Sequence, residues 1–473
     1  MWNGRASLCK QRTLEDAVPA TRLSPLDDSF LGLEEPTAHM HVGWTSLFEP
    51  PAEGPRPSFE ELRSHIADRI PRAPRYRQKL SPAPLEFDAP SWVDDEEFDI
   101  ARHVIPATDG NLDEAVQECM SCQLDRDHPL WEIRIAERTE DGRIGVIGKA
   151  HHSMVDGIAA VEMASLLLDP TEDAEAEEGD GWLPSPAPPA AARVATAVVE
   201  KAKGQLRLLR GAARLAASPR RITELPTQAA DAAVAAGRTL RPATPVEPLN
   251  QPLSVQRRLA RVEQPLDQLK QVKERFGTTL NDVYLAAAAG AVRELLLDHN
   301  RRPVPLKAMV PVSVRDDGEL DELGNRISFM FVELPCDEPD AERRLRRVHM
   351  ATSQAKASGD AGLGDFALKL AGSAPRRAQR LVSRLMASPR MFNLVVSNIP
   401  GPTEPMYMAG CELKEAYPVV PLAQGHTLSI GMTTLRDSAC FGLYADGEGL
   451  GDVERVAHAL EGSTDQLVRL SER

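Results

Sequence analysis

The chain has 473 residues, of which 42% are hydrophobic and 26% are charged, and this length and balance predict a globular protein of two domains. Its 55 basic and 70 acidic residues give a formal net charge of −15, which argues against a chain-wide nucleic-acid footprint. Six scattered cysteines are too few for a disulfide framework and favour a reducing compartment.

The beginning of the chain carries no recognisable targeting signal. Residues 1–21 contain no apolar run long enough for a signal-peptide core, so we predict a disordered extension there. Nowhere does an uninterrupted apolar stretch approach the roughly 18 residues that span a bilayer. We therefore expect a cytoplasmic protein that would meet lipid only from outside, at the inner membrane or at lipid inclusions.

Strand-like and helix-like patterns alternate along the first half of the chain. Two apolar segments flank an Asp141-Gly142 turn, and we predict that they pair as strands. The predicted elements are helices at 59–70, 112–124 and 157–168, and strands at 131–136 and 143–150.

Composition changes abruptly after residue 170. Residues 171–181 hold six acidic residues and no Lys or Arg, and residues 182–190 hold four prolines, which is typical of a linker. Residues 193–221 then carry eight basic residues, with apolar positions at helical spacing. This pattern predicts a basic amphipathic helix at 191–221. Such a helix either lies on an anionic membrane or lipid-droplet surface or packs on the protein as a bridge, and the sequence leaves both open.

Regular patterns resume at about residue 251 and continue to the end of the chain. The predicted elements are strands at 253–262, 306–314, 392–399, 427–435 and 440–444, and helices at 265–276, 281–297 and 452–470.

Two αβ halves of similar size, joined by a long linker, would form a site in the cleft between them. The resulting division is an extension at 1–21, an N-terminal domain at 22–170, a linker at 171–250 and a C-terminal domain at 251–473.

The sharpest chemical feature is the sequence His-His-Ser-Met-Val-Asp-Gly at 151–157, placed where a strand ends and a helix is expected to begin. Adjacent side chains on an extended backbone point to opposite sides, so one of His151 and His152 would face a cavity and the other would be structural. A neutral histidine is a suitable base near pH 7. Asp156 would orient the loop and Gly157 would permit an unusual backbone angle. Metal binding fits poorly, because the histidines lack helical i, i+4 spacing and cysteine ligands; two structural histidines remain the alternative.

The HHxxxDG pattern resembles the motif of the CoA-dependent acyltransferase superfamily, which includes chloramphenicol acetyltransferase and the condensation domains of nonribosomal peptide synthetases. Other motifs resemble the bacterial wax ester synthase/diacylglycerol acyltransferase family, in that family's order. They are Leu23-Ser24-Pro25-Leu26-Asp27, Met40-His41-Val42-Gly43, Pro129-Leu130-Trp131-Glu132, Asn281-Asp282, Pro311-Val312-Ser313-Val314-Arg315, Leu323-Gly324-Asn325-Arg326 and Ser397-Asn398-Ile399-Pro400-Gly401-Pro402.

This resemblance implies two chloramphenicol-acetyltransferase-like α/β (α+β) domains with mixed sheets and an active-site tunnel at their interface. It implies that His152 removes the proton from the hydroxyl of a diacylglycerol or long-chain alcohol, which attacks an acyl-CoA thioester. Acyl-CoA is then a substrate, and no separate cofactor is expected. Membrane or lipid-droplet contact and homodimer formation stay open.

The family motifs also suggest roles for residues in the second half and around the histidines. Asn281, Ser397 and Asn398 are candidate donors to the oxyanion, although Thr279 to Asp282 also fits a helix cap, and Ser397 to Pro402 also fits a strand ending in a turn. Asp156 would brace its loop against an arginine, for which Arg315 is the candidate. Trp131 is expected in the core, with lining of the acyl channel as the alternative.

Two rival functions remain open at this point. One is another HHxxxDG transferase, such as a condensation-type enzyme, whose donor is tethered to a carrier protein. The other is a lipid-droplet surface protein that keeps the fold without turnover.

Overall fold

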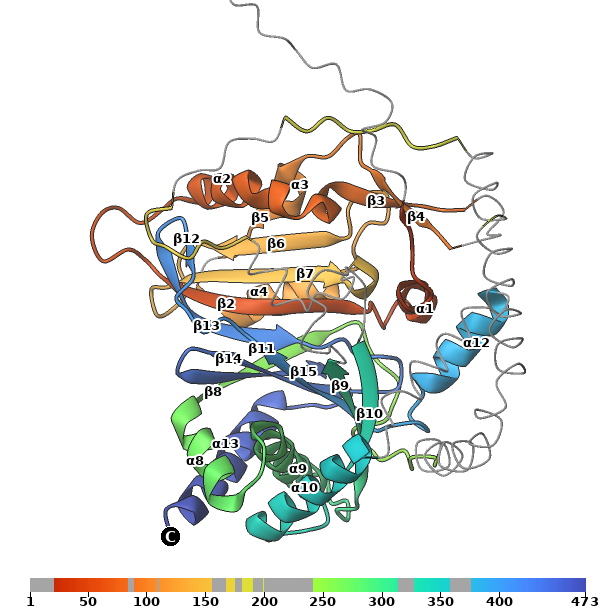
Figure 1. Cartoon of the computed structure of the whole chain (residues 1–473), viewed down its shortest axis with the longest axis vertical. Helices are drawn as coiled ribbons and strands as arrows, with labels where there is room; N and C mark the ends of the chain where they lie inside the picture. The colour runs from red at the N-terminus through yellow and green to blue at the C-terminus, as the bar shows by residue number, and fades with distance from the viewer. Residues whose placement is uncertain are drawn as a thin grey trace, which may run out of the picture.

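Two six-stranded sheets, stacked one above the other, form the centre of the molecule in the computed structural model (Figure 1). The structure describes residues 21–83, 89–108, 110–154, 167–174, 181–189, 199, 241–313, 327–357 and 376–473. Both sheets are mixed, because β5 pairs in parallel with β6, and β11 pairs in parallel with β14 and β9. The predicted α/β class is confirmed.

The N-terminal sheet has the order β12-β13-β2-β7-β6-β5. Its central strands are buried along almost their whole length, since helices cover one face and the other face meets the C-terminal body. Its strands are β2 (His41–Glu49), β5 (Val104–Pro106), β6 (Trp131–Ala136), β7 (Ile144–His151), β12 (Tyr407–Met408) and β13 (Cys411–Val419).

The C-terminal sheet has the order β10-β9-β11-β14-β15-β8. Its strands are β8 (Arg257–Pro265), β9 (Leu306–Ser313), β10 (Ile327–Leu334), β11 (Leu394–Pro400), β14 (Leu428–Leu435) and β15 (Ser438–Asp446). A further small sheet consists of β1 (Thr21–Arg22), β4 (Ser91–Asp94) and β3 (Gln78–Ser81).

The C-terminal half of the chain contributes two strands to the N-terminal sheet. Strands β12 and β13 lie late in the sequence, yet β13 pairs with β2 and completes the N-terminal sheet. The division at residue 251 therefore follows chain order but does not separate the two sheets.

Helices cover the outer faces and fill part of the space between the sheets (Figure 1). α2 (Phe59–Arg69) and α3 (Ile100–His103) lie over the N-terminal sheet, and α4 (Leu112–Ser121) contacts both β7 and β8. The far side of the C-terminal sheet carries α8 (Leu266–Phe276), α9 (Leu280–Asp298), α10 (Ala341–Ala357) and α13 (Val453–Ser471). α1 (Pro25–Leu33) and α12 (Arg376–Met386) lie together at one side of the molecule.

Most predicted elements are present, with shifted ends. The 112–124 helix ends at Ser121, where the backbone of Cys122 becomes extended. The strand predicted to begin at residue 253 begins at Arg257, because the backbone and hydroxyl of Ser254 bind the Asp446 carboxylate and hold a turn there. Nearly all of the predicted extension and of the helices at 157–168 and 191–221, and most of the linker, lie outside the described residues. Two ends of these predictions are wrong: Thr21 pairs with Trp92 in β1, and residues 167 and 168 are not helical.

Candidate functional site

The paired histidines lie at the end of β7, beside the start of β2. His151 is the last residue of the strand, and His152 begins a short 3-10 turn that ends at Met154. His151 is opposite His41 in the antiparallel register, and the His152 amide donates a hydrogen bond to the Met40 carbonyl (2.9 Å). Met40 has a φ of +52°, a left-handed conformation that non-glycine residues adopt rarely. This unusual backbone presents the carbonyl that holds His152.

Ser153 fixes His151 at the Nδ1 side of its ring, whereas its buried Nε2 has no hydrogen-bond partner among the described residues. Its Nδ1 accepts from the Ser153 amide (3.1 Å) and lies 2.7 Å from the Ser153 hydroxyl, while its Nε2 lies 3.6 Å from a Glu34 carboxylate oxygen. The side chain is buried, and burial lowers its pKa to about 3. The lowered pKa keeps the His151 ring neutral at pH 7.

His152 has a different environment. Its ring stacks on Phe30 of α1, with ring centroids 3.6 Å apart and an interplanar angle of 15°. The residue stays partly exposed, whereas its Nδ1 is buried and has no hydrogen-bond partner among the described residues. Burial lowers the pKa of His152 to about 4, and an interaction with its own backbone offsets part of this effect. The ring is therefore neutral at pH 7, with a free lone pair on one nitrogen.

Two more histidines extend the cluster along β2. The His39 ring lies 5.3 Å from that of His41, which in turn lies 6.4 Å from that of His151. Burial lowers the pKa of His41 well below its usual value, and neither of its ring nitrogens has a partner among the described residues. Within that part of the chain, no group of His, Cys, Asp or Glu side chains is arranged to hold a metal ion. Buried polar atoms without partners are uncommon in native proteins and call for a functional explanation.

The candidates from the second half occupy α9 and β11. Ser397 is buried on β11, where its carbonyl accepts a hydrogen bond from the Tyr284 hydroxyl (3.1 Å), and Asn398 is half-buried beside it. Asn281 is half-buried in the first turn of α9. Among the described residues, no hydrogen bond joins these side chains to the histidines.

Asp282 has the capping role that the sequence suggested. Its carboxylate accepts from the Thr279 amide, which completes a capping box at the start of α9. It also accepts from the Thr352 hydroxyl (2.6 Å) and lies 2.8 Å from His349 Nδ1, so this buried carboxylate joins α9 to α10 as well.

Trp131 lies in the core of the N-terminal body. Its indole nitrogen donates to the Tyr76 carbonyl (2.8 Å), and its ring stacks on His103 with centroids 4.6 Å apart. Only 2% of the residue is exposed. This placement is the core environment expected for it, and Trp131 is not among the residues that line the apolar cavity described next.

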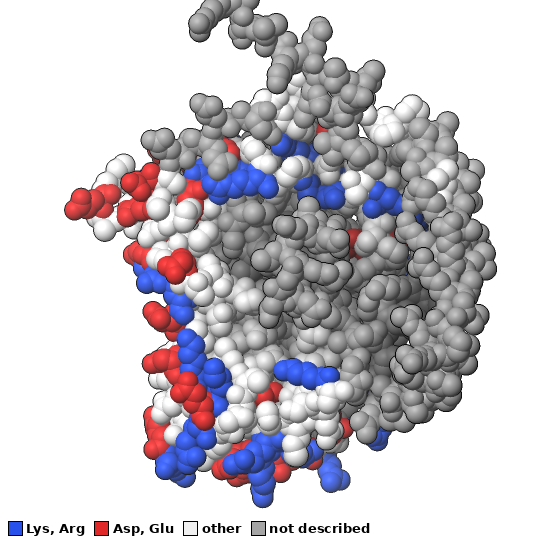
Figure 2. Space-filling view, viewed as in Figure 1, with Lys and Arg blue, Asp and Glu red and all other residues white. Residues whose placement is uncertain are grey.

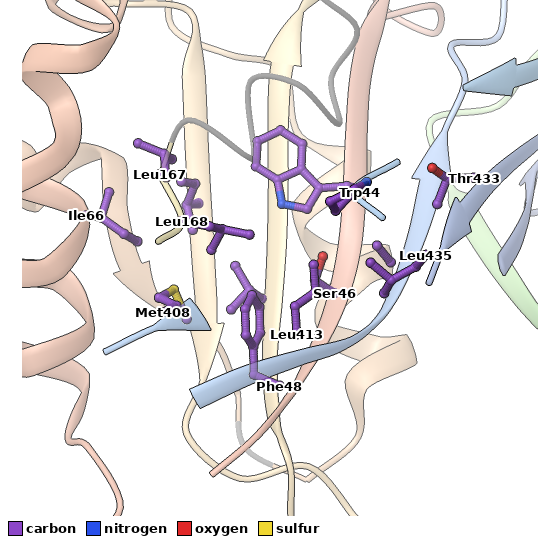
Figure 3. Close-up of a pocket in the computed structure, with 14 residues that line it drawn as sticks. Trp44, Ser46, Phe48, Ile66, Leu167, Leu168, Met408, Leu413, Thr433 and Leu435 are labelled. Atoms are coloured by element: carbon purple, nitrogen blue, oxygen red, sulfur yellow. The ribbon is translucent and has the colours of Figure 1, made fainter. Parts of the chain in front are cut away.

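An apolar cavity lies between β2, β13 and α2, with Trp44 projecting into it (Figure 3). Trp44 fits there only because residue 148 of the paired strand is a glycine: a Cβ at that position would lie 2.1 Å from the indole. Trp44 was not predicted from the sequence, because β2 is buried on both faces and shows no alternation. The lining residues are Trp44, Ser46, Phe48, Ile66, Ile133, Val146, Leu167, Leu168, Pro402, Met408, Leu413, Ala416, Thr433 and Leu435.

Three predicted site residues lie outside the described part of the chain: Asp156, Gly157 and Arg315. No helix within that part is both long and apolar enough to cross a membrane. Figure 2 shows basic and acidic side chains interspersed over the described part of one face.

Two family models match this chain. The model described as the wax ester synthase/diacylglycerol acyltransferase catalytic domain matches residues 23–284, and the WS/DGAT C-terminal domain model matches residues 323–467. Two Mycobacterium tuberculosis relatives carry the names "Probable diacyglycerol O-acyltransferase" tgs1 and tgs2. The first is 32% identical over 477 residues, covering 95% of this chain and 96% of the relative; the second is 31% identical over 467 residues, covering 94% and 98%.

Solved structures give the same picture of the fold. The wax ester synthase/diacylglycerol acyltransferase from Marinobacter aquaeolei VT8 has a TM-score of 0.66 and 26% identity, covering 96% of this chain and all of that one (100%). The starter condensation domain of rhizomide synthetase, in complex with C8-CoA and Leu-SNAC, has a TM-score of 0.57 and 14% identity, covering 96% of this chain and 95% of that one. At that identity the second match bears on the fold alone.

Proposed function

Because the chain belongs to the wax ester synthase/diacylglycerol acyltransferase family, we propose that it transfers an acyl group from acyl-CoA to the hydroxyl of a diacylglycerol or a long-chain alcohol, with His152 as general base. Membership confirms the resemblance drawn from the sequence motifs and makes the chain an acyltransferase. The donor, the acceptor and the role of His152 are the proposed parts.

The observation that carries the proposal is the environment of the His152 ring. The His152 ring stacks on Phe30, and the backbone amide of His152 donates a hydrogen bond to the Met40 carbonyl. The position of the ring is therefore fixed before substrate binds. The lowered pKa keeps it neutral at pH 7. Its neighbour His151 has its Nδ1 occupied by Ser153, which makes it the weaker candidate.

The reaction then needs a single addition and elimination. With the imidazole proton on Nδ1, the Nε2 lone pair takes the proton of the acceptor hydroxyl while the oxygen attacks the thioester carbonyl carbon. The tetrahedral intermediate collapses, the carbon–sulfur bond breaks, and the imidazolium returns the proton to the CoA sulfur. Positioned base catalysis of this kind is typically worth about 10²- to 10⁴-fold.

The oxyanion of that intermediate needs a hydrogen-bond donor. Among the sequence candidates, Ser397 is buried, whereas Asn281 and Asn398 have half-buried side chains that a substrate reaches more easily. We therefore propose the amide of Asn281 or Asn398 as the first donor to test, with the Ser397 hydroxyl as the alternative. We also propose that Asp156 pairs with Arg315 and so stabilises the loop that contains Gly157.

The acyl chain of the donor requires an apolar environment, and we propose that it enters among the apolar residues around Trp44, where the cavity of about 30 Å³ must widen to admit it. Its lining is almost entirely aliphatic and aromatic. Val42, Trp44, Ala150 and Trp131 share one face of the N-terminal sheet by strand alternation, and His152 follows Ala150 by two residues. This shared face supports an acyl chain that runs from the base toward Trp44.

The test is release of CoA thiol from palmitoyl-CoA, with hexadecanol or dipalmitoylglycerol as acceptor. We expect acceptor-dependent release that His152→Ala reduces by about 10²-fold or more. His458→Ala, at an exposed histidine of α13, is the matched control and should retain full release. Unchanged release by His152→Ala would refute the base. If the unmodified protein released no CoA with hexadecanol and none with dipalmitoylglycerol, the result would favour a donor tethered to a carrier protein, or a surface protein without turnover.

A further inference from the structure

Helix α12 presents its apolar side to solvent. Leu381, Val382 and Leu385 are 60%, 37% and 59% exposed, and together they account for three of the eight large hydrophobic side chains that are exposed in the described part of the chain. At 100° per residue these three positions fall on one side of the helix. Surface helices normally bury such a side against the protein.

The opposite, arginine-bearing side of α12 faces the protein. Arg376 makes a two-point ion pair with Asp28 of α1 (2.5 and 3.1 Å), and Arg384 lies 3.8 Å from Glu35. Between them, Arg380 packs over Gly32, where a Cβ would lie 3.1 Å from its side chain. These arginine contacts fix the orientation of α12. The leucines on the opposite side of the helix therefore point toward solvent.

From this reversed amphipathicity we propose that α12 docks the enzyme on an anionic phospholipid surface by inserting Leu381, Val382 and Leu385. Exposed apolar side chains of this kind gain free energy in the interfacial region of a lipid layer. The exposed charge of the helix fits the same partner: α12 has no acidic residue, and Arg384 lies 3.8 Å from Glu35 without being buried by it. The Arg384 side chain remains 59% exposed beside the leucines.

The location of α12 connects this surface to the proposed site, and this step rests on the proposed function. α12 contacts α1 (Figure 1). α1 also supplies Phe30, which stacks on His152. A lipid layer in contact with α12 would lie one helix away from the proposed base. Acceptors such as diacylglycerols reside in lipid layers, so docking there would bring the acceptor to the enzyme without passage through water.

Flotation of the full-length protein with vesicles tests the proposal without requiring turnover. The vesicles contain phosphatidylcholine alone, or phosphatidylcholine with phosphatidylglycerol as the minor component. We expect flotation with the anionic vesicles, and a decrease of about tenfold or more for Leu381→Gln/Leu385→Gln. The matched control is Leu297→Gln/Met350→Gln, which changes exposed apolar residues on α9 and α10 and should float like the unmodified protein.

Two further measurements separate this proposal from the acyltransferase proposal. His152→Ala should float normally, and Leu381→Gln/Leu385→Gln should retain CoA release in detergent micelles. Arg384→Gln should reduce the preference for anionic vesicles. Equal flotation of both double variants would overturn the docking role of α12, as would absence of flotation by the unmodified protein or a change in oligomeric state as the only effect of Leu381→Gln/Leu385→Gln.

Discussion

The buried histidines at the end of β7 and His426 of the C-terminal body differ in their hydrogen-bond partners. Each ring nitrogen of His426 lies near a carbonyl, with Nδ1 3.3 Å from Ala423 and Nε2 3.1 Å from Phe392. By contrast, His152 Nδ1 has no partner among the described residues, and neither do the two ring nitrogens of His41. Burial lowers the pKa of His426 to about 4, as it does for His152, so protonation does not distinguish them.

This difference separates two uses of a buried polar group. A buried polar group with partners contributes to stability, whereas one without a partner costs about 1–3 kcal/mol and persists where function requires it. The C-terminal body has further examples of the first kind, in the Asp282 cluster and in the buried Arg257–Asp446 ion pair. Under the proposed function, the histidine cluster at β7 is an example of the second kind.

The largest effect should come from His152→Ala. We expect kcat to fall by about 10²- to 10⁴-fold, because a proposed base is removed. We also expect a smaller loss in the free energy of unfolding than for His426→Leu, since the variant gives up the stacking on Phe30 but also removes a buried nitrogen without a partner. Steady-state CoA release and urea denaturation provide the two measurements.

His426→Leu provides the reverse case. It should lower the free energy of unfolding by about 1–3 kcal/mol, because the carbonyl that accepts the single N–H of the neutral ring loses its donor, while kcat of the folded enzyme stays near its original value. The distinction between the two histidines would be wrong if His152→Ala and His426→Leu had similar effects on kcat and similar effects on the free energy of unfolding.

The next largest effect should be on stability, from Arg257→Met. Arg257 and Asp446 are both buried, with 3.1 Å between their charged groups, and Arg257 also donates to the Thr37 carbonyl of the N-terminal body. Removal of one partner leaves the other charge buried, which costs about 3–5 kcal/mol. Urea denaturation should therefore show a lower midpoint. In this variant Asp446 keeps its hydrogen bonds from the amide and hydroxyl of Ser254. If the free energy of unfolding fell by less than about 1 kcal/mol, these two bonds would be enough to stabilise the buried carboxylate.

The lowered pKa values predict how pH separates activity from stability. A histidine has a pKa of about 6.5 in the unfolded chain, and about 4 for His152 and His426 in the folded protein. The unfolded chain binds more protons between these values, so the stability present above pH 6.5 is lost as pH falls toward 4. Activity per folded molecule should nevertheless stay constant down to about pH 5. The pH profile of kcat/KM, with the folded fraction measured in parallel, checks this, and an acid limb near pH 6.5 in fully folded enzyme would contradict it.

The sequence predicted the α/β class and the position of the His151–His152 pair, because the signals are local. Alternating patterns, the Asp141-Gly142 turn and the Thr279–Asp282 cap depend on neighbouring residues, and the structure places each where it was expected. The environment of His152 could not be predicted in this way. Its contacts come from Phe30 and Met40, more than 100 residues earlier in the chain, and no periodicity encodes them.

Strands β2 and β13 were missed for a related reason. β2 is buried over eight of its nine residues, and its sequence therefore lacks the period-two pattern that marks a strand with one solvated face. Its pairing with β13 joins residues that lie on opposite sides of the linker. Trp44 depends on both features, and so the cavity that it enters could not be located from the sequence.

The smallest predicted effect distinguishes two buried tryptophans on the same face of the N-terminal sheet. Trp131→Phe removes the bond to the Tyr76 carbonyl and should lower the free energy of unfolding by about 1–2 kcal/mol, with no change in acyl-chain preference, because Trp131 packs in the core. Trp44→Phe should instead enlarge the apolar cavity and favour longer acyl chains. Since one methylene in a pocket is worth about 1–3 kcal/mol, the ratio of kcat/KM for stearoyl-CoA to that for palmitoyl-CoA should rise about fivefold or more. If Trp131→Phe shifted this ratio and Trp44→Phe did not, the acyl chain would lie along Trp131, and the cavity around Trp44 would be a packing defect of the core.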